Sequence, residues 1–257
     1  MDKEIENKYV QLFNNPELLK CNVSEKDYQA VMPRVQQISR LAKIEAAIYA
    51  IYDFNKGNYL LQSEEQKLIF GVNENNPEID LKTHYAAIHP DDRDFVLETD
   101  YMFHNFFSTL SPKEKFNYKL VYDFRTKTVD GRYLRFMHQC VVFEQDQEGN
   151  LWLTLVISYP LSEMKKNEKS SRYLINIETK SFHLFHENGY NTSGSVLTRR
   201  EIEIVELLAR GYDSVTIADK LYLSRNTINN HRQNILSKTK SDNTTQAVLF
   251  CKRLGLV

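Results

Sequence analysis

Residues Leu223–Ile235 read LSRNTINNHRQNI, a stretch with four asparagines, one glutamine, two arginines and one histidine but only three aliphatic residues. Amide side chains are costly to bury and propagate helices poorly. If Ser224 caps a helix here, Ile228 and Ile235 mark its buried face, because successive helical residues are about 100° apart. The opposite face then collects Asn226, Asn229, Asn230 and Gln233. Such a face is either merely solvated or suited to reading base edges, since Asn and Gln pair bidentately with adenine.

The flanking sequence predicts three further helices. The first helix is expected to start at the cap Thr198, with Glu201 completing a capping box, and to stop at Gly211. The expected caps of the other three helices are Asp213, Ser224, and Asn243 or Thr244. The second and third helices are short and are joined by the tripeptide YLS, which is the spacing of a helix-turn-helix.

The segments LTRREIEIVELLARG, IADKLYLSRNTINNHRQNILSKT, AV and LGLV follow in this order and resemble the LuxR-type (GerE-like) DNA-binding domain. The resemblance implies a four-helix domain that binds DNA as a dimer. In that family the third helix enters the major groove, and the fourth often forms the dimer contact. The family's groove-facing positions fall on Asn229, Asn230 and Gln233, while Thr227 and His231 match its conserved threonine and histidine pattern.

Cationic and hydroxyl side chains around the same helix are candidates for holding DNA phosphates. These positioning residues are Arg225, Thr227, His231, Arg232 and Lys238. The sequence departs from the family at Thr239 and Ser241, where hydrophobic residues are usual, and at Thr244, where arginine is usual. Dimerisation through the fourth helix is therefore left open. Thr216 replaces a usual glutamate, so Asp213 has to cap the second helix.

Charge is unevenly distributed along the chain. From Leu197 to Val257 there are ten Lys and Arg against six Asp and Glu, whereas residues 1–196 have 23 against 28. A basic tail on an acidic body favours a polyanion as the partner of the tail alone. The three cysteines lack metal-ligand spacing, no signal peptide is evident, and no apolar run is long enough to cross a bilayer. We therefore expect a cytoplasmic protein with no metal site and no membrane contact.

The front of the chain changes from a helical to an alternating pattern. Ser24 and Asp27 have capping-box spacing, and Pro33 would break or kink the helix that follows. Strands are predicted at AAIYAIYDF, YLLQS, FNYKLVYDF, RYLRFMHQCVVF and LWLTLVISY, with a helix after HPDDR between the second and third. Alternation with intervening turns predicts a meandering antiparallel sheet with one covered face.

The segments AAIHPDDRDFV and VDGRYLRFMHQ resemble a PAS domain. The resemblance implies a five-stranded antiparallel sheet with helices on one face, used for sensing, dimerisation or both. The expected fold is therefore α+β, a PAS-like sheet with helices followed by an all-α four-helix domain. The predicted parts are an N-terminal helical segment (1–44), a PAS-like sensor (45–161), a connector with an extra hairpin and a linker (162–196), and the helix-turn-helix domain (197–257).

A sensor pocket is a candidate on one strand face, although a packed core with a satisfied histidine is the favoured alternative. The residues of that face are Leu134, Phe136, His138 and Cys140. His104 stands where a haem ligand would be expected, but a helical wheel turns it about 130° from the apolar face, toward solvent. No haem or flavin motif is evident, so the sequence identifies no cofactor.

These features favour a sequence-specific DNA-binding transcription regulator, with the signal sensed in front and DNA read by the tail. The alternative is a sigma-factor-like promoter-binding module that acts with RNA polymerase. An enzyme is disfavoured, because neither a nucleophile with its base nor a phosphate-binding glycine loop is present. The expected partners are double-stranded DNA, a second copy of the chain and an unidentified small-molecule or protein signal, with RNA polymerase as a further candidate.

Overall fold

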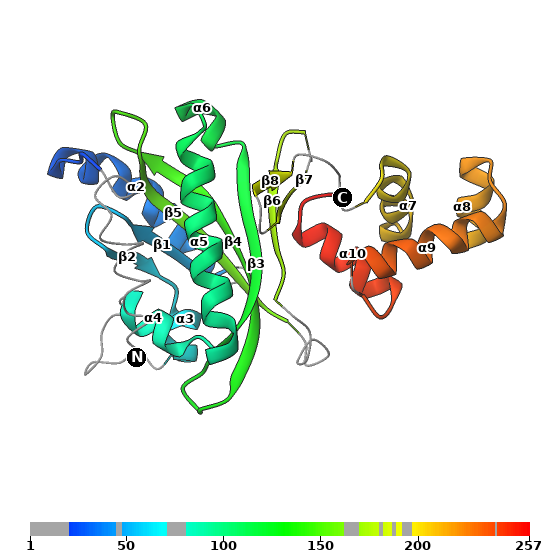
Figure 1. The fold of residues 1–257 in the computed structure, drawn as a ribbon, viewed down its shortest axis with the longest axis horizontal. Helices are drawn as coiled ribbons and strands as arrows, with labels where there is room; N and C mark the ends of the chain where they lie inside the picture. Colours follow the sequence, from blue (N-terminus) through cyan, green and yellow to red (C-terminus); the bar gives the residue numbers. More distant parts are fainter. Residues whose placement is uncertain are drawn as a thin grey trace. The chain divides into compact units, whose positions relative to one another are not determined.

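A computed structural model describes residues 21–44, 48–70, 81–161, 170–179, 182–186, 189–191, 197–239 and 241–257. The chain divides into two compact units, Met1–Tyr173 and Leu174–Val257 (Figure 1). The first unit contains α2 (Glu25–Ala42), β1 (Ile48–Asp53), β2 (Asn58–Gln62), α3 (Glu64–Phe70), α4 (Leu81–Ala87), the 3-10 helix η1 (Pro90–Asp92), α5 (Arg93–Ser108), α6 (Pro112–Lys115), β3 (Tyr118–Lys127), β4 (Tyr133–Gln145) and β5 (Leu151–Pro160). The strand β6 (Arg172–Asn176) crosses the division, and the second unit continues with β7 (Phe182–His186), β8 (Gly189–Asn191), α7 (Arg199–Ala209), α8 (Ser214–Leu221), α9 (Arg225–Thr239) and α10 (Thr244–Arg253).

The strands of the first unit form an antiparallel sheet in the order β2-β1-β5-β4-β3. Tyr122 of β3 lies opposite His138 of β4, and Cys140 of β4 lies opposite Val156 of β5. The turn between β4 and β5 contains Gly149 at φ +83°, a left-handed conformation that favours glycine. The five predicted strands are therefore present and antiparallel, and the α+β fold class is confirmed, but the sheet continues from β3 to β6 and is larger than predicted.

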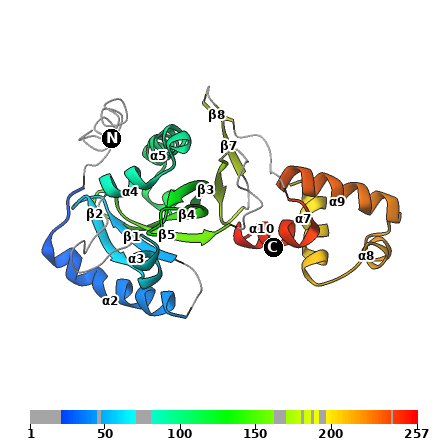
Figure 2. The ribbon, with the colours of Figure 1, turned by 90° about the horizontal axis from the view of Figure 1, so that it is seen from below.

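Helices lie on both faces of this sheet. Figure 2 shows α4 and α5 on one side and α2 on the other. Val31 and Val35 of α2 belong to one buried cluster with Ile51 of β1 and Leu155 of β5. The prediction of a single covered face was wrong, because the second face of the alternating strands is also apolar and needs a cover. Pro33 lies inside α2 without ending it.

The HPDDR sequence attaches the start of α5 to β3. Asp92 is only 5% exposed. Its carboxylate accepts hydrogen bonds from Nε and Nη2 of Arg125, at 2.9 and 2.7 Å, and from the Arg125 backbone N–H at 2.8 Å. The backbone N–H of His89 donates in turn to the Arg125 carbonyl at 2.8 Å. The adjacent aspartates are therefore part of a structural joint between a helix and a strand.

The extra hairpin after the sheet is present. β6 pairs antiparallel with β7, where Leu174 lies opposite His183, and β7 pairs with β8, where Phe185 lies opposite Tyr190. β8 occupies part of the segment 188–195 that was predicted to be a linker, so that part of the prediction was wrong. Its glycine and asparagine content resembles a turn, and only pairing with β7 makes it a strand. The rest of that linker, and residues 162–169 of the predicted connector, lie outside the described residues.

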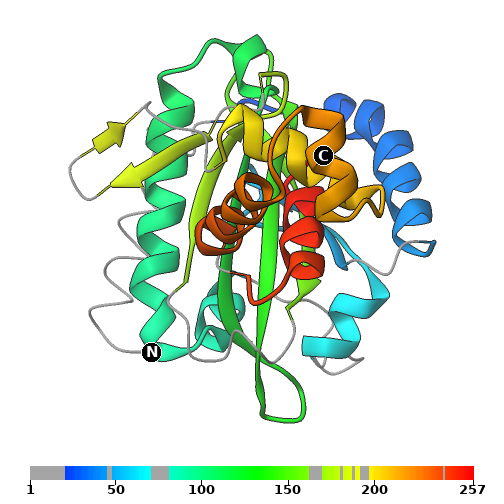
Figure 3. The ribbon, with the colours of Figure 1, turned by 90° about the vertical axis from the view of Figure 1, so that its right-hand side faces the viewer.

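Four helices end the second unit, as predicted, and Figure 3 shows them in yellow to red. Each predicted cap is present, because backbone N–H groups donate to side-chain oxygens of Thr198 (3.2 Å), Asp213 (2.8 Å), Ser224 (3.0 Å) and Asn243 (3.0 Å). All four helices contribute side chains that are no more than 1% exposed, including Ile204, Val205, Ile217, Ile228, Ile235 and Cys251. Within the described ranges, none of the helices combines the length and apolarity needed to cross a bilayer.

Candidate nucleic-acid interface and front cavity

The four amides predicted to read bases lie on the exposed side of α9. Ile228 and Ile235 are buried beneath them, as the helical wheel predicted. The exposed residues are Asn226, Asn229, Asn230 and Gln233. In the part of the chain that the structure describes, none of these four side chains makes a hydrogen bond. Packing inside the domain therefore does not account for this row of amides.

A tight turn between α8 and α9 sets the position of the amide row. Tyr222 adopts φ +54°, and the N–H of Leu223 donates to the carbonyl of Ala218 at 2.9 Å. The Tyr222 side chain is 95% exposed. Sequence reasoning gave no sign of this conformation, because left-handed positions are usually glycine or asparagine. Directly after the turn, Ser224 caps α9 and Arg225 is exposed at its first turn.

Two of the predicted phosphate-binding side chains bind residues of other helices. Arg232 donates to the hydroxyls of Ser214 (2.6 Å) and Thr244 (2.7 Å), which links α9 to α8 and α10. Lys238 pairs at 2.7 Å with Glu201, whose side chain is almost fully buried. We therefore revise both predictions, since the sequence reveals a cationic residue but not the partner it selects within the fold. Arg225, Thr227 and His231 remain the candidates for phosphate contacts.

The Lys238 contact has a clear electrostatic effect. Burial by itself raises the pKa of Glu201, but hydrogen bonds from Lys238 and Thr198 outweigh burial, so the pKa is lowered on balance. The carboxylate is thus held ionised at the start of α7, where it also completes the capping box. This contact makes Lys238 a residue that joins α9 to α7.

The departures from the LuxR-type pattern are accommodated by hydrogen bonds. The hydroxyl of Thr239 is buried and donates to the carbonyl of Ile235 at 2.7 Å, and it lies 3.0 Å from the hydroxyl of Ser241. Thr244 accepts its hydrogen bond from Arg232. Polar residues thus replace the usual side chains without leaving these hydroxyls unpaired.

α10 also has an exposed apolar side chain, Leu249, which is 47% exposed.

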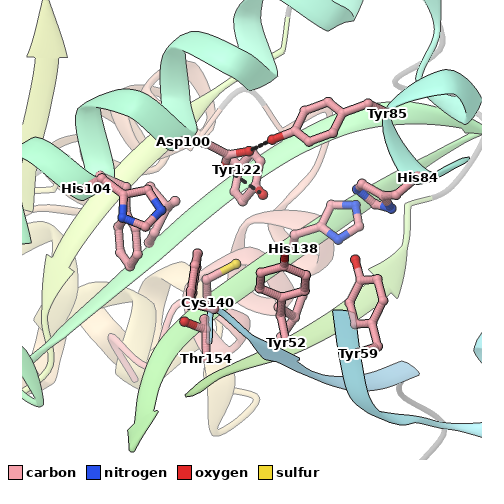
Figure 4. A pocket seen from close by; sticks show the side chains of 14 residues that line it. Tyr52, Tyr59, His84, Tyr85, Asp100, His104, Tyr122, His138, Cys140 and Thr154 are labelled. Carbon is pink, nitrogen blue, oxygen red and sulfur yellow. Dashed lines mark hydrogen bonds between the residues drawn. The ribbon is translucent and has the colours of Figure 1, made fainter. Parts of the chain in front are cut away.

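The first unit contains a cavity of about 90 Å³ between the sheet and the helices α4 and α5. Figure 4 shows the side chains around it. They come from all five strands and from both helices: Tyr52, Phe54, Tyr59, His84, Tyr85, Asp100, Phe103, His104, Leu120, Tyr122, His138, Cys140, Thr154 and Val156. An engineered cavity of about 150 Å³ holds benzene, so the enclosed space here suits a small molecule.

The predicted pocket residues are divided between two cavities. His138 and Cys140 line the larger one, while Phe136 lines a smaller one of about 20 Å³, which His138 also reaches. Leu134 is half-buried and lines neither. His138 is not the fully satisfied core histidine that was favoured, because its Nδ1 pairs with Ser158 at 2.8 Å but its Nε2 has no partner among the described residues.

His104 does not point to solvent as the helical wheel predicted. It is buried, lines the larger cavity and packs edge-on against Phe54, with ring centroids 5.0 Å apart. The buried arc of α5 is wider than its apolar stripe, because β1 and its following turn approach the helix from that side. A helical wheel uses the sequence of one helix alone and therefore contains no information about the neighbouring strand β1.

Burial controls the protonation of the cavity wall. It lowers the pKa of His84 and His104 to about 4 and that of His138 to about 3, so these imidazoles are neutral at physiological pH. Burial also raises the pKa of Asp100 to about 6, although hydrogen bonds from the hydroxyls of Tyr85 and Tyr122 oppose this effect. Asp100 is consequently ionised near neutral pH and gives the cavity wall its negative charge.

Comparisons with known proteins find relatives of the four-helix tail. Residues 195–251 match the family described as "Bacterial regulatory proteins, luxR family" and form a LuxR-family helix-turn-helix domain. The transcriptional regulatory protein DegU of Brevibacillus brevis is 40% identical over 73 residues, which are 28% of this chain and 31% of that protein. The chain thus spans about three tenths of the length of the curated relatives that it matches.

Solved structures are similar to different parts of the chain. The transcription factor GerE is 40% identical over 24% of this chain and 94% of its own, with a TM-score of 0.24. A phage VqmA–DPO complex is 15% identical over 89% of this chain and 91% of its own, with a TM-score of 0.34.

Proposed function

We propose that this chain is a sequence-specific, DNA-binding transcription regulator that reads DNA through α9. The observation that carries the proposal is the row of exposed amides on the third helix of a LuxR-family domain. In the major groove such amides pair with adenine N6 and N7. The base-reading residues are Asn226, Asn229, Asn230 and Gln233.

Phosphate contacts fix the register of α9 in the groove. Arg225 and Thr227 lie in the first turn of α9, and His231 lies one turn further on. The N-terminus of α9 adds a partial positive charge and backbone N–H donors. The tail has ten basic against six acidic residues, which supports attraction to a polyanion.

The front unit serves as the sensor in this proposal. Its antiparallel sheet encloses a cavity with polar and aromatic walls, which is the usual character of a small-molecule site. We assign sensing to residues 45–161, the connection to 162–196 and DNA reading to 197–257. A signal bound in front changes the geometry of two tails in a dimer, and thereby their match to two half-sites on DNA.

The substitution Asn230→Ala tests the reading helix. The operator is first selected from a random DNA pool, and binding is followed by fluorescence anisotropy at fixed salt. Loss of one bidentate contact weakens operator binding by about 1–3 kcal/mol and leaves non-specific binding nearly intact. Gln37→Ala, an exposed amide on α2, is the matched control and changes neither affinity.

Two results would contradict the proposal. Equal loss of affinity on operator and random DNA would remove the base-reading role of Asn230. A full-length chain that binds DNA only together with RNA polymerase would favour the sigma-factor-like alternative.

A further inference from the structure

The larger cavity of the first unit has one acidic group and no basic partner for it. Among the described residues that line it there is no lysine or arginine, and its three histidines are neutral at physiological pH. Asp100 is only partly buried and faces this space from α5. The phenol hydroxyls of Tyr85 and Tyr122 donate to its carboxylate. These two donors hold the carboxylate in place but do not neutralise it.

Aromatic rings form much of the remaining wall. Tyr52 packs edge-on against both Phe54 and Tyr59, with ring centroids 4.9 and 5.3 Å apart, and Phe103 lies beside His104 at 6.0 Å. The faces of such rings carry negative electrostatic potential and attract cations, most strongly where water is excluded. A carboxylate among aromatic rings therefore favours a cationic group over a neutral or anionic one.

Two further polar atoms at the wall have no hydrogen-bond partner in the described part of the chain. They are Nε2 of His138 and Oγ1 of Thr154, and both side chains are buried. Buried polar groups are normally paired, and an unpaired one in a cavity wall indicates a ligand or water that completes it. The occupant thus needs a hydrogen-bonding group in addition to a charge. At about 90 Å³ the enclosed space suits only a small molecule with a few non-hydrogen atoms.

We propose that this cavity binds a small organic ammonium ion that carries a second hydrogen-bonding group, such as an amino alcohol or an amino ketone. The ammonium group donates to the carboxylate of Asp100 and lies among the aromatic rings, while the second group pairs with Thr154 or His138. This inference rests on the proposed function, because it identifies the chemical class of the signal that the front unit senses.

The groups around Asp100 make binding dependent on pH. Four tyrosines line the cavity together with Asp100: Tyr85 of α4, Tyr52 of β1, Tyr59 of β2 and Tyr122 of β3. The other titratable side chains of the wall are His84, His104, His138 and Cys140. Only Asp100 changes charge between pH 5 and 7, because its pKa is about 6. A cation binds the ionised carboxylate, so affinity is full above pH 7 and falls toward ten-fold for each pH unit below 6.

Three molecules of matched shape separate the possible occupants. We would titrate the full-length protein with 1-amino-2-propanol, propane-1,2-diol and lactate, which are cationic, neutral and anionic, and follow binding by ligand-observed NMR. The amino alcohol is expected to bind at least ten-fold more tightly than the diol, and lactate is expected not to bind. The fourth probe, propylamine, lacks the hydroxyl, so Thr154→Val should weaken the amino alcohol more than it weakens propylamine.

Asp100→Asn removes the charge and keeps the shape. It should abolish the preference for amine over diol, whereas Asp94→Asn, an exposed residue in the first turn of the same helix, should retain it. A diol that binds as tightly as the amine, a preference for lactate, or selectivity that survives Asp100→Asn would each overturn the proposal. If the variant does not fold, the titrations of the wild-type protein with the four ligands, and their pH dependence, still test whether the cavity prefers a cation.

Operator binding by the same protein sample distinguishes this inference from the proposed function. Intact sequence-specific DNA binding with no amine preference would remove only the cation proposal. Loss of sequence-specific DNA binding in the wild-type chain would remove the proposed function, whatever the cavity binds.

Discussion

Asp92 shows how much structure a single carboxylate can fix. It lies in HPDDR, and its oxygens accept hydrogen bonds from the guanidinium and the backbone N–H of Arg125. Asp92→Asn is expected to lower the free energy of unfolding of the front unit by about 2–4 kcal/mol, because it leaves Arg125 without its anionic partner. Urea unfolding monitored by Trp152, the single tryptophan, measures this.

Asp91 provides the control, because it is exposed and lies 3.4 Å from the same arginine. Asp91→Asn should change the free energy of unfolding by no more than about 0.5 kcal/mol. Equal effects of the two substitutions would contradict the structural role of Asp92.

The contribution of Asp92 also has a defined pH dependence. Burial raises its pKa, but the hydrogen bonds from Arg125 outweigh burial and lower the pKa on balance. A carboxyl with a lowered folded pKa stabilises the protein above its unfolded pKa of about 3.9 and loses that effect as the pH falls through the folded pKa. The difference in stability between wild type and Asp92→Asn should therefore shrink below about pH 4.

At the scale of elements, the turn between α8 and α9 carries a conformational cost. Tyr222 is held at φ +54°, and its side chain is almost fully exposed, so little packing compensates for the left-handed conformation. Glycine adopts that conformation without the clash of a Cβ atom. Tyr222→Gly is therefore expected to raise the free energy of unfolding of the tail by about 0.5–1 kcal/mol.

Tyr222→Ala is the matched control, since it removes the ring but retains the Cβ atom. It should give little or none of this gain when both variants are compared by calorimetry. A gain with alanine as large as that with glycine would place the cost in the exposed ring, not in the backbone.

Elements that depend on local sequence were predicted well, and those that depend on neighbours were not. The caps at Thr198 and Asp213 form within four residues, so spacing alone predicts them. By contrast, the burial of His104 depends on Phe54, which is fifty residues away, and β8 depends on its pairing with β7. The amide row of α9 was predictable because one helix creates it. The cavity was predictable only in part, through His138 and Cys140 on one strand, because five strands and two helices contribute to its wall.

At the scale of the whole molecule, the two parts of the chain have opposite net charges. The first 196 residues have a net charge of −5 and the last 61 a net charge of +4, so a polyanion is attracted to the tail and repelled by the rest. If α9 reads DNA as proposed, one such helix contacts only a short site, and specificity in a genome requires more base pairs than it reads. We propose that a second copy of the chain supplies them, with the exposed Leu249 of α10 as an apolar contact between copies.

Half-site spacing tests this arrangement. Two α9 helices in one symmetric dimer meet the same face of DNA when the half-sites are about 34 Å, or one helical turn, apart. Inserting 5 base pairs between the half-sites turns one of them to the opposite face, so affinity should fall at least ten-fold, and inserting 10 should restore much of it. Leu249→Glu should weaken binding to the native spacing and remove this periodicity, while Val215→Glu, which alters an exposed apolar residue on α8, should leave the periodicity intact. Affinity that is indifferent to the 5-base-pair insertion in the wild type would mean that the two tails are not held together by α10.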